Sequence, residues 1–390
     1  MIPVIKVNYK LWELLEAAFI PCSRDKYLPL LEKEVCRYFG VDEALFACSG
    51  RSALYFILKG LPQRKVVVPA YTCDAVAEAV ALAGKEIVYA HVGGPNLDMV
   101  LEGLVDSDTI VVATHQFGMP CNIGCIRAMC KTRGAIVVED CAGALGTRID
   151  GRLAGTFGDF AFFSFNASKL VTAPAMGGFA ISANPGEIRK LKQTLPPMRG
   201  GTKHKVRSLL KSVALCLYKH PVFHDVLARA KRKRRQGEAH LDAQTYHAKP
   251  TLIEEFQYPF CDWQAKTVLR QFKKIDSLLA ARQRMFDAFM GVLRKSRIPL
   301  GFANVPTGNR FPLLVENREE AVSRFRAHGI ATAAGFDHFV CPGDYTDELR
   351  LADRILYLPF GSGFTGKEIA KVASVLETAL PASVFAPRNQ

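Results

Sequence analysis

Short apolar runs alternate with amphipathic segments along the first two-thirds of this sequence. The apolar runs are rich in Val and Ile and end at Gly, Pro or Asp, whereas the segments between them carry apolar residues at helical spacing. This alternation predicts a mainly parallel β-sheet that helices cover on both faces, because parallel neighbours need a long connection between them. The expected strands are residues 65–70, 85–92, 109–118, 135–146, 160–165 and 177–182, and the expected helices are residues 52–61, 73–84 and 123–134.

Composition limits the class of protein. The 390 residues are 49% hydrophobic and 23% charged, which is typical of a globular chain with one large domain or two. The start of the sequence lacks the ordered features of a signal peptide, and no uncharged apolar run reaches the ~18 residues of a membrane-spanning helix. The eleven cysteines are scattered, without a Cys-x-x-Cys pair or zinc spacing. We therefore expect a cytoplasmic protein with reduced thiols and no metal site.

Polar residues follow several of the expected strands, at the edge of the sheet where α/β proteins bind their ligands. Residues 46–58 run from a strand into a helix through the sequence Ser-Gly-Arg-Ser at 49–52. The free N–H groups of such a helix start favour an anion such as phosphate, although a plain serine N-cap explains the same residues. Asp140 ends another strand, where its carboxylate either holds a protonated ring nitrogen or caps a helix.

Lys169 stands between two strand-like runs, among small polar residues. A partly desolvated lysine has a lowered pKa and can form a Schiff base with an aldehyde. Taken alone, the residue is better explained as a lysine of a surface loop. His115 also follows a strand, and by itself it indicates a hydrogen-bonded structural histidine.

Five collinear motifs together resemble those of the DegT/DnrJ sugar aminotransferases, a family of fold-type-I enzymes that use pyridoxal 5′-phosphate (PLP). The resemblance covers about residues 30–185 and 250–380. It implies a mainly parallel seven-stranded central sheet with helices on both faces and a small α+β C-terminal domain. The motifs are Ser49-Gly50-Arg51-Ser52-Ala53-Leu54, Val66-Val67-Val68-Pro69-Ala70-Tyr71-Thr72, His115-Gln116-Phe117-Gly118, Glu139-Asp140-Cys141-Ala142, and Ser164-Phe165-Asn166-Ala167-Ser168-Lys169 followed by Gly177-Gly178.

The resemblance also implies the residues of a PLP site. Lys169 would bind PLP as a Schiff base and move a proton during transfer, and Asp140 would keep the pyridine nitrogen protonated. Gln257 matches a position that reaches the phosphate site of a partner subunit, which implies a homodimer. His115 would contact the substrate. Besides Lys169 and Asp140, the expected PLP contacts are Ser49, Gly50, Arg51, Ser52, Tyr71, Cys73, Ala142 and Ser164, with Gln257 from the partner.

The retained lysine bears on the reaction. A dehydratase branch of the family carries His in place of Lys169, so the lysine favours amino transfer. We expect an aminotransferase that converts a nucleotide-linked or lipid-linked keto-sugar into an amino-sugar, with glutamate or glutamine as the amino donor. The alternatives are a non-catalytic or regulatory PLP-binding protein and a PLP enzyme for a lipid-like, non-sugar carbonyl. The sequence departs from the family pattern at the rim of the site, at Arg51, Cys73, Gly143 and Met176.

A domain boundary is expected near residue 250. Residues 1–250 would form the large PLP-binding domain, with a basic helical insertion at about 190–250, and residues 251–390 the small C-terminal domain. Apolar spacing predicts one long amphipathic helix over 262–293 that links the two. By resemblance, His338 lies where the small domain approaches the substrate.

The segment 189–249 carries most of the charge. It has sixteen Lys and Arg and three Asp and Glu, a net charge of +13, against +14 for the whole chain. Basic amphipathic helices bind membrane surfaces, so we expect residues 200–236 to contact an anionic membrane. Packing on the protein's own body is the alternative, and nucleic acid is the less favoured partner, since no nucleic-acid module accompanies the segment. The apolar face of its first helix consists of Val206, Leu209, Leu210, Val213 and Leu217, and a KRKRR run occupies 231–235.

Overall fold

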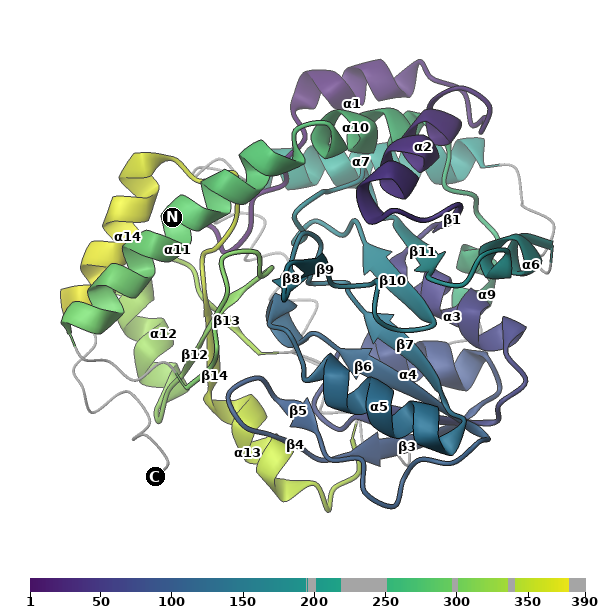
Figure 1. The fold of residues 1–390 in the computed structure, drawn as a ribbon. Coiled ribbons are helices and arrows are strands. Elements are labelled where there is room, and N and C mark those ends of the chain that lie inside the picture. Colours follow the sequence, from purple (N-terminus) through teal and green to yellow (C-terminus); the bar gives the residue numbers. More distant parts are fainter. Residues whose placement is uncertain (194, 196–200, 219–250, 297–300, 336–340, 379–390) are drawn as a thin grey trace.

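A seven-stranded sheet forms the centre of the computed structural model, which describes residues 1–193, 195, 201–218, 251–296, 301–335 and 341–378. Its last five strands in spatial order run parallel, and β11 is antiparallel to both of its neighbours (Figure 1). This arrangement confirms the predicted fold class. In spatial order the strands are β1 (Ala44–Ala47), β11 (Gly178–Ser182), β10 (Phe160–Ser164), β7 (Ile136–Asp140), β6 (Thr109–Thr114), β2 (Lys65–Pro69) and β3 (Glu86–Ala90).

Helices cover both faces of this sheet. Side chains alternate along a strand, so Val66 and Val68 of β2 share one apolar core with α3 and α4, whereas Val67 joins the core under α5. All three valines are fully buried, as expected for a parallel sheet covered on both sides. The connecting helices are α3 (Gly50–Gly60), α4 (Asp74–Leu82) and α5 (Ile123–Arg133).

The C-terminal part builds a second, smaller sheet beside the first (Figure 1). Phe289, Phe325 and Val372, from three different helices, meet in its apolar core. Ile2 joins the same core and pairs with Ile330, so the N-terminal end of the chain lies against the C-terminal unit. The sheet is antiparallel in the order β12 (Phe311–Leu314), β14 (Ile355–Leu358) and β13 (Ala333–Ala334), and the helices are α11 (Ile275–Lys295), α12 (Arg318–Ala327), α13 (Thr346–Arg354) and α14 (Gly366–Thr378).

The prediction of one helix over 262–293 is wrong, because two helices occupy this stretch. α10 (Asp262–Phe272) ends before Lys274, which leaves the helical conformation with φ −113° and ψ 19°, and α11 follows. α10 packs on α2 (Tyr27–Phe39) near the large sheet, whereas α11 packs on α14. The break redirects the chain from one unit to the other. Apolar spacing continues across it because Phe272 and Ile275 are both buried.

The helix α9 (Thr251–Phe256) also lies beside the large sheet, where Phe256 packs on Tyr55 of α3 with 5.1 Å between the ring centroids. The domain boundary near residue 250 stays a prediction. The remaining elements are the 3₁₀ helix η1 (Gln116–Gly118), α6 (Glu187–Gln193) and two small hairpins, β4 (Val92–Gly93) with β5 (Asp98–Met99), and β8 (Arg148–Ile149) with β9 (Arg152–Leu153).

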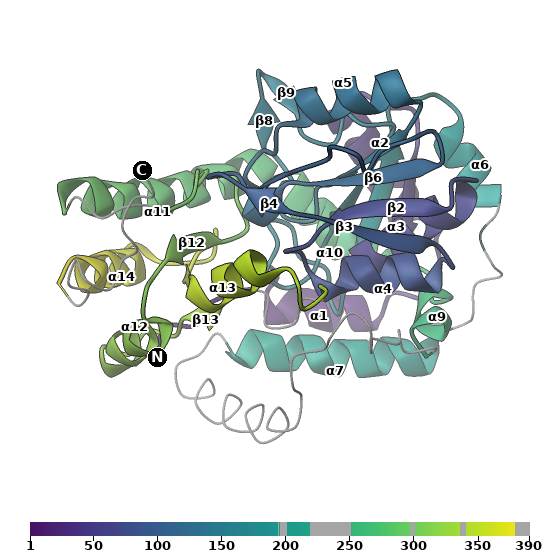
Figure 2. The ribbon, with the colours of Figure 1, turned by 90° about the horizontal axis from the view of Figure 1, so that it is seen from below.

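Helices α1 (Leu11–Ala18) and α7 (Thr202–Tyr218) lie side by side at the end of the molecule beyond β1 (Figures 1 and 2). α7 is the first helix expected in the basic segment. The pattern expected after Pro221 and the KRKRR run at 231–235 lie outside the described residues. Among the helices that the structure describes, none is both long enough and apolar enough to span a bilayer.

Candidate active site

The polar strand ends singled out in the sequence meet at one cavity of about 420 Å³. The cavity lies where parallel strands end and the chain turns into helices, which is the usual ligand-binding edge of such a sheet. Residues of the C-terminal unit, among them Asn309 and Arg310, close it from the other side. Nine of the predicted site residues line it, namely Ser49, Gly50, Arg51, Cys73, His115, Asp140, Ala142, Ser164 and Lys169.

Lys169 follows β10 through the short loop after Ser164. Burial and, second, the positive charge of Arg310 lower the pKa of Lys169 to about 8. The Asn309 amide fits its surroundings when its nitrogen donates to the Phe117 carbonyl oxygen at 3.1 Å. Its oxygen then accepts a hydrogen bond from the Lys169 Nζ at 3.3 Å. The amine is therefore held in the cavity in a state that is easily deprotonated.

Asp140 ends β7, which pairs in parallel with β10, the strand that leads to Lys169. Its Oδ1 accepts a hydrogen bond from the Ala142 N–H at 2.9 Å. Burial raises the pKa of Asp140, while the Ala142 N–H and the positive charge of Lys169 oppose that rise. Within the described part of the chain, no hydrogen bond engages its second oxygen. A cationic N–H group in the cavity would stabilise this carboxylate in its charged form.

The start of α3 supplies backbone N–H groups to the same cavity. Ser49 is its N-cap and accepts from the Ser52 N–H at 3.1 Å, while the Ser49 N–H donates back to the Ser52 hydroxyl at 3.0 Å. Ser52 is fully buried, so its hydroxyl closes this capping box and does not line the cavity. The first N–H groups of the helix have no intrahelical acceptor and favour an anion.

Two glycines allow the start of α3 to approach the sheet closely. A Cβ on Gly178 would lie 2.5 Å from the Gly50 nitrogen, and one on Gly50 would lie 3.0 Å from the Ser164 Cβ. Any side chain at position 178 would push α3 away from β11. It would thereby widen the anion-binding cradle that the start of α3 forms with the end of the sheet. The half-buried Ser164 adds a side-chain donor beside it. Together these features are suited to binding an anion.

Arg51 stands in this cradle but also has an acidic partner. Its Nε lies 2.8 Å from the Glu78 Oε2 on α4. Glu78 is buried, and its carboxylate partly neutralises the guanidinium of Arg51. Arg51 therefore attracts an anion in the cradle less strongly than an unpaired arginine would. Sequence reasoning placed Arg51 at the phosphate and did not anticipate Glu78.

His115 is held in a buried hydrogen-bond network. Its Nδ1 accepts from the Cys121 N–H at 3.2 Å, so its Nε2 carries the proton and donates to the Glu139 carboxylate at 3.1 Å. Glu139 also accepts from the N–H groups of Gly155, Phe157 and Gly158. Both ring nitrogens are thus engaged inside the protein. The substrate contact of His115 stays a prediction.

Of the other predicted residues, those that the structure describes do not line the cavity. Tyr71 is fully buried and packs edge-on against Phe117, with 6.2 Å between the ring centroids. Gln257 is half-buried just after α9, whereas its neighbours Glu255 and Phe256 line the cavity. His338 lies outside the described residues.

Asn309 and Arg310 are the functional candidates that sequence reasoning missed. Arg282 of α11 is fully buried and donates to the carbonyl oxygens of Thr307 at 3.1 Å and Gly308 at 2.7 Å. It thereby fixes the loop that carries Asn309 and Arg310 into the cavity. No local motif marks this loop, and the only signal in the sequence is an Asn-Arg pair directly before an apolar strand.

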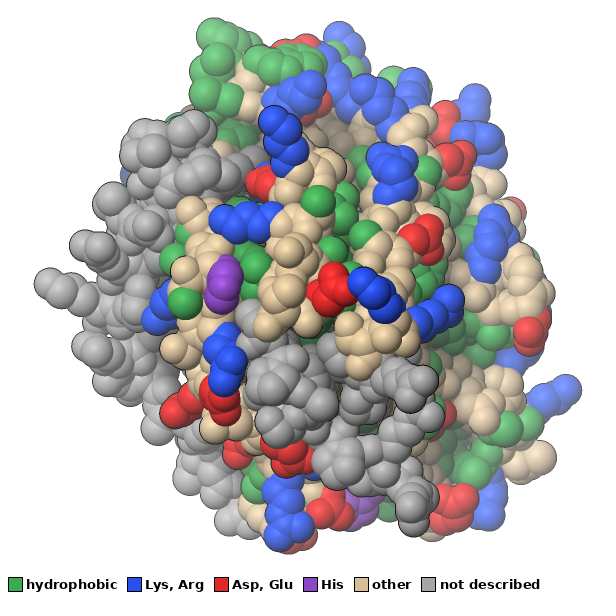
Figure 3. Space-filling model, turned by 90° about the vertical axis from the view of Figure 1, so that its left-hand side faces the viewer, with side chains coloured by type: hydrophobic (Ala, Val, Ile, Leu, Met, Phe, Trp, Pro, Cys, Tyr) green, Lys and Arg blue, Asp and Glu red, His purple; other side chains and the backbone are tan. Residues whose placement is uncertain are grey.

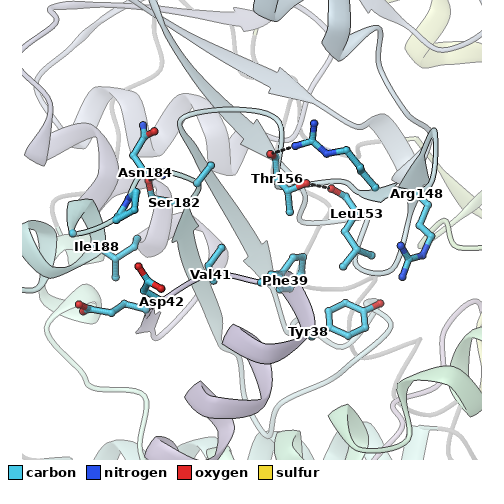
Figure 4. Close-up of a pocket in the computed structure, with 16 residues that line it drawn as sticks. Tyr38, Phe39, Val41, Asp42, Arg148, Leu153, Thr156, Ser182, Asn184 and Ile188 are labelled. Atoms are coloured by element: carbon cyan, nitrogen blue, oxygen red, sulfur yellow. Dashed lines mark hydrogen bonds between the residues drawn. The ribbon is translucent and has the colours of Figure 1, made fainter.

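A second cavity, of about 500 Å³, lies away from these residues (Figure 4). It is bordered by the end of α2, the β8–β9 hairpin and the turn after β11. Arg152 donates to the Thr156 carbonyl oxygen there at 2.8 Å, and Thr156 donates to the Leu153 carbonyl oxygen at 2.7 Å. None of the predicted site residues lines this cavity, so the Lys169 cavity is the candidate active site.

Comparisons with known proteins identify the family of this chain. The model of the DegT/DnrJ/EryC1/StrS aminotransferase family matches residues 21–377. The UDP-N-acetyl-3-dehydro-alpha-D-glucosamine 3-aminotransferase of Acidithiobacillus ferrooxidans is 26% identical over 374 residues, which are 90% of this chain and 88% of that protein. The GDP-perosamine synthase of Caulobacter vibrioides is 25% identical over 384 residues, 92% of this chain and 91% of that protein.

Solved structures share the fold. The aminotransferase PseC of Helicobacter pylori, involved in the biosynthesis of pseudoaminic acid, matches with a TM-score of 0.70 at 16% identity, over 95% of this chain and 96% of that one. The sugar aminotransferase CalS13 of Micromonospora echinospora matches with a TM-score of 0.69 at 19% identity, over 97% and 100%.

Proposed function

This chain belongs to the DegT/DnrJ/EryC1/StrS aminotransferase family, and we propose that it transfers an amino group from glutamate or glutamine to a keto-sugar, with PLP bound at Lys169. The observation that carries the proposal is the meeting of Lys169, Asp140 and the start of α3 in one cavity. Relatives over nearly the whole chain are named for acting on nucleotide-linked sugars. A nucleotide-linked or lipid-linked keto-sugar is therefore the proposed acceptor.

The residues of the cavity fit PLP. Three of its polar groups are an aldehyde, a pyridine nitrogen and a phosphate, and the cavity offers an amine, a carboxylate and a helix start with close-packed glycines. Lys169 would bind the aldehyde carbon, Asp140 the ring N–H, and Ser49, Gly50 and Ser164 the phosphate. When bound, PLP supplies a conjugated ring that withdraws electrons from the carbon bearing the amino group.

Lys169 is suited to move a proton at that carbon. With a pKa of about 8, about one-tenth of the amine is unprotonated at pH 7, against about 0.03% for an ordinary lysine. Asn309 keeps the Nζ in the cavity by accepting its hydrogen bond. Asp140 would hold a proton on the ring nitrogen of bound PLP, and its burial would strengthen this interaction. The protein thereby provides the base and the counter-charge that amino transfer requires.

The same family likeness supports a homodimer with shared sites. Gln257 occupies the position that reaches a partner's phosphate site, and its side chain does not line the cavity of its own chain. We propose that Gln257 completes the α3 cradle of the second subunit.

The proposal is tested with the purified full chain. Reduction of the PLP-loaded protein with borohydride should give one labelled peptide containing Lys169. Addition of glutamate should release 2-oxoglutarate and change the absorbance of the bound cofactor, and the aminated protein should then react with one member of a panel of nucleotide-linked and lipid-linked keto-sugars. A label on another lysine would refute the site. PLP binding without amino transfer from either glutamate or glutamine would favour the regulatory alternative.

A further inference from the structure

We propose that α1 and α7 together form a docking surface for an anionic lipid bilayer. Both helices leave large apolar side chains in the solvent. Phe19, directly after α1, is 90% exposed, and Leu210 of α7 is 66% exposed. The α1–α7 surface consists of Leu11, Trp12, Leu15 and Phe19 with Val206, Leu210 and Leu217.

The orientation of α7 explains why these side chains are exposed. Its most buried residues are polar, namely Lys205, Ser208 and Ser212. The Lys205 Nζ donates to the Ala18 carbonyl oxygen at 2.8 Å, and the Ser212 hydroxyl accepts from the Ala175 N–H at 2.7 Å. These polar contacts help to attach the helix to the body. Part of its apolar stripe, Val206, Leu210 and Leu217, is left without cover.

Of the five residues that form the apolar face of α7, two pack on the protein. Leu209 and Val213 contact the cluster around Tyr9 and Leu14, next to α1. Leu11, Trp12 and Leu15 of α1 are exposed in the same way as the rest of the α7 face. From the sequence, membrane contact and packing on the protein's own body are alternatives for the apolar face of α7. In the structure, part of this face packs on the body and part of it is exposed. A group of exposed apolar side chains on neighbouring helices is the usual mark of a binding surface.

Exposed cations accompany the apolar side chains. Lys203, Arg207 and Lys211 of α7 are exposed, and none of them is in an ion pair with a described residue. α7 contains no Asp or Glu at all. Figure 3 shows hydrophobic side chains gathered at the end of the molecule that carries α1, with Lys and Arg beside them. The sequence places a net charge of +13 in residues 189–249.

The charge decides between a bilayer and a second copy of this chain. A two-fold contact through the α1–α7 surface would bring the same cations face to face, which is unfavourable. An anionic bilayer offers phosphates to the cations and an apolar interior to the Trp, Phe and Leu side chains. The surface therefore matches lipid better than it matches itself.

The docking surface adjoins the candidate active site. Ser212 of α7 hydrogen-bonds Ala175, and the next residue, Met176, is 43% exposed and lines the Lys169 cavity. Docking through α1 and α7 would place the entrance of the cavity close to the headgroups. A substrate carried on a lipid could then reach Lys169 without leaving the membrane.

The test is co-sedimentation of the full chain with vesicles at low salt. Vesicles of phosphatidylglycerol and phosphatidylcholine in equal parts should bind the protein, and phosphatidylcholine alone should bind it weakly. Binding should be lost at 1 M salt, where the Debye length is ~3 Å. Each cation contributes about 1 kcal/mol, a factor of about five, so Lys203→Gln with Arg207→Gln and Lys211→Gln should weaken partitioning about 100-fold. The matched control is Arg127→Gln with Lys131→Gln and Arg133→Gln, three exposed cations of α5. This control should leave vesicle binding nearly unchanged.

The apolar contribution is tested by Leu15→Ser, with Val100→Ser as its control. Val100 is 50% exposed on the segment after β5, away from α1 and α7. The Leu15 change should weaken vesicle binding about tenfold and the Val100 change should leave it unchanged. Equal binding by the Leu15 variant, or no binding of the unchanged protein to anionic vesicles, overturns the proposal. Conversion of a dimer into a monomer by Leu15→Ser, without any vesicle binding, would assign the surface to a second copy.

Discussion

The Asn309 side chain joins the C-terminal unit to Lys169: its amide oxygen accepts from the Lys169 Nζ at 3.3 Å while its nitrogen donates to the Phe117 carbonyl oxygen. Asn309 precedes β12 by two residues, whereas Lys169 follows β10 of the large sheet. The orientation of the amine therefore depends on how the two units pack. It does not follow from either unit alone.

Replacing Asn309 with Ala should lower the rate of amino transfer about tenfold, because the amine loses the acceptor that holds it in the cavity. Asn309→Asp should instead raise the pKa of Lys169, since it adds a negative charge. Single-turnover kinetics with glutamate across pH would measure both effects. Unchanged kinetics in the Ala variant would show that Asn309 only packs.

Gly143 offers a second way to displace the same amide. A Cβ at this position would lie 2.6 Å from the Asn309 amide nitrogen that donates to Phe117, so Gly143→Ala should displace the whole amide and disturb its contact with Lys169. Gly151→Ala is the control, because a Cβ there meets no atom within 4 Å, although its positive φ adds some strain. We expect Gly143→Ala to reduce the rate as Asn309→Ala does. A normal rate would mean that the loop adapts.

Lys169→Ala should abolish amino transfer and leave no borohydride-stable cofactor on the protein, because no other described lysine lines the cavity. Asp140→Asn should keep the fold and reduce the rate at least 100-fold, since an amide cannot balance a protonated ring nitrogen. Circular dichroism would confirm folding for both variants. Near-normal turnover of Asp140→Asn would show that Asp140 only accepts the hydrogen bond of the Ala142 N–H and does not act on the cofactor.

The central sheet could be predicted from the sequence because its strands are short apolar runs that end at polar residues. Each of β2, β3, β6, β7, β10 and β11 lies within an expected run. The same pattern places Lys169 and Asp140 at strand ends on one edge of the sheet, whereas their roles come from the family resemblance.

The rest depends on contacts between distant segments. The break between α10 and α11 is invisible in the apolar spacing because Phe272 and Ile275 continue the pattern. Asn309 and Arg310 reach the cavity only because Arg282, more than twenty residues earlier, fixes their loop. Glu78 could not be linked to Arg51 from the sequence, since the two lie on different helices.

The reaction of the free protein with PLP should depend on pH through Lys169. Burial, and then Arg310, lower the pKa of Lys169 to about 8, and only the neutral amine attacks an aldehyde. The rate of PLP capture should thus rise as the pH approaches 8 and level off above it. Arg310→Gln should move the midpoint to higher pH by removing a positive charge, whereas Arg148→Gln, outside this cavity, should not. An unchanged midpoint in Arg310→Gln would show that the charge of Arg310 does not influence the pKa of Lys169.

Glu139 should contribute to stability more than to catalysis. Burial alone would raise its pKa, but the His115 hydrogen bond and the backbone N–H groups of Gly158 and Gly155 lower it below the usual value. Its contribution is therefore present above the pKa of an unfolded glutamate, about 4.3, and is lost as the pH falls through the lower folded value. Glu139→Ala should cost at least about 3 kcal/mol at pH 7, because it leaves several buried donors unpaired. Urea unfolding would measure this cost, and a loss below about 1 kcal/mol would contradict it.

Shared active sites predict complementation between inactive variants. Lys169→Ala and Gln257→Ala should each be strongly impaired alone, the first for lack of its amine and the second because the phosphate cradle of its partner is incomplete. In a mixed dimer, one site would combine an intact Lys169 with an intact Gln257 from the other subunit. Mixing and refolding the two variants should therefore restore up to about one quarter of the normal activity, from half of the dimers with one working site each. Sedimentation at micromolar concentration would establish the dimer, and a monomer, or no recovery despite mixed dimers, would place Gln257 outside the partner's site.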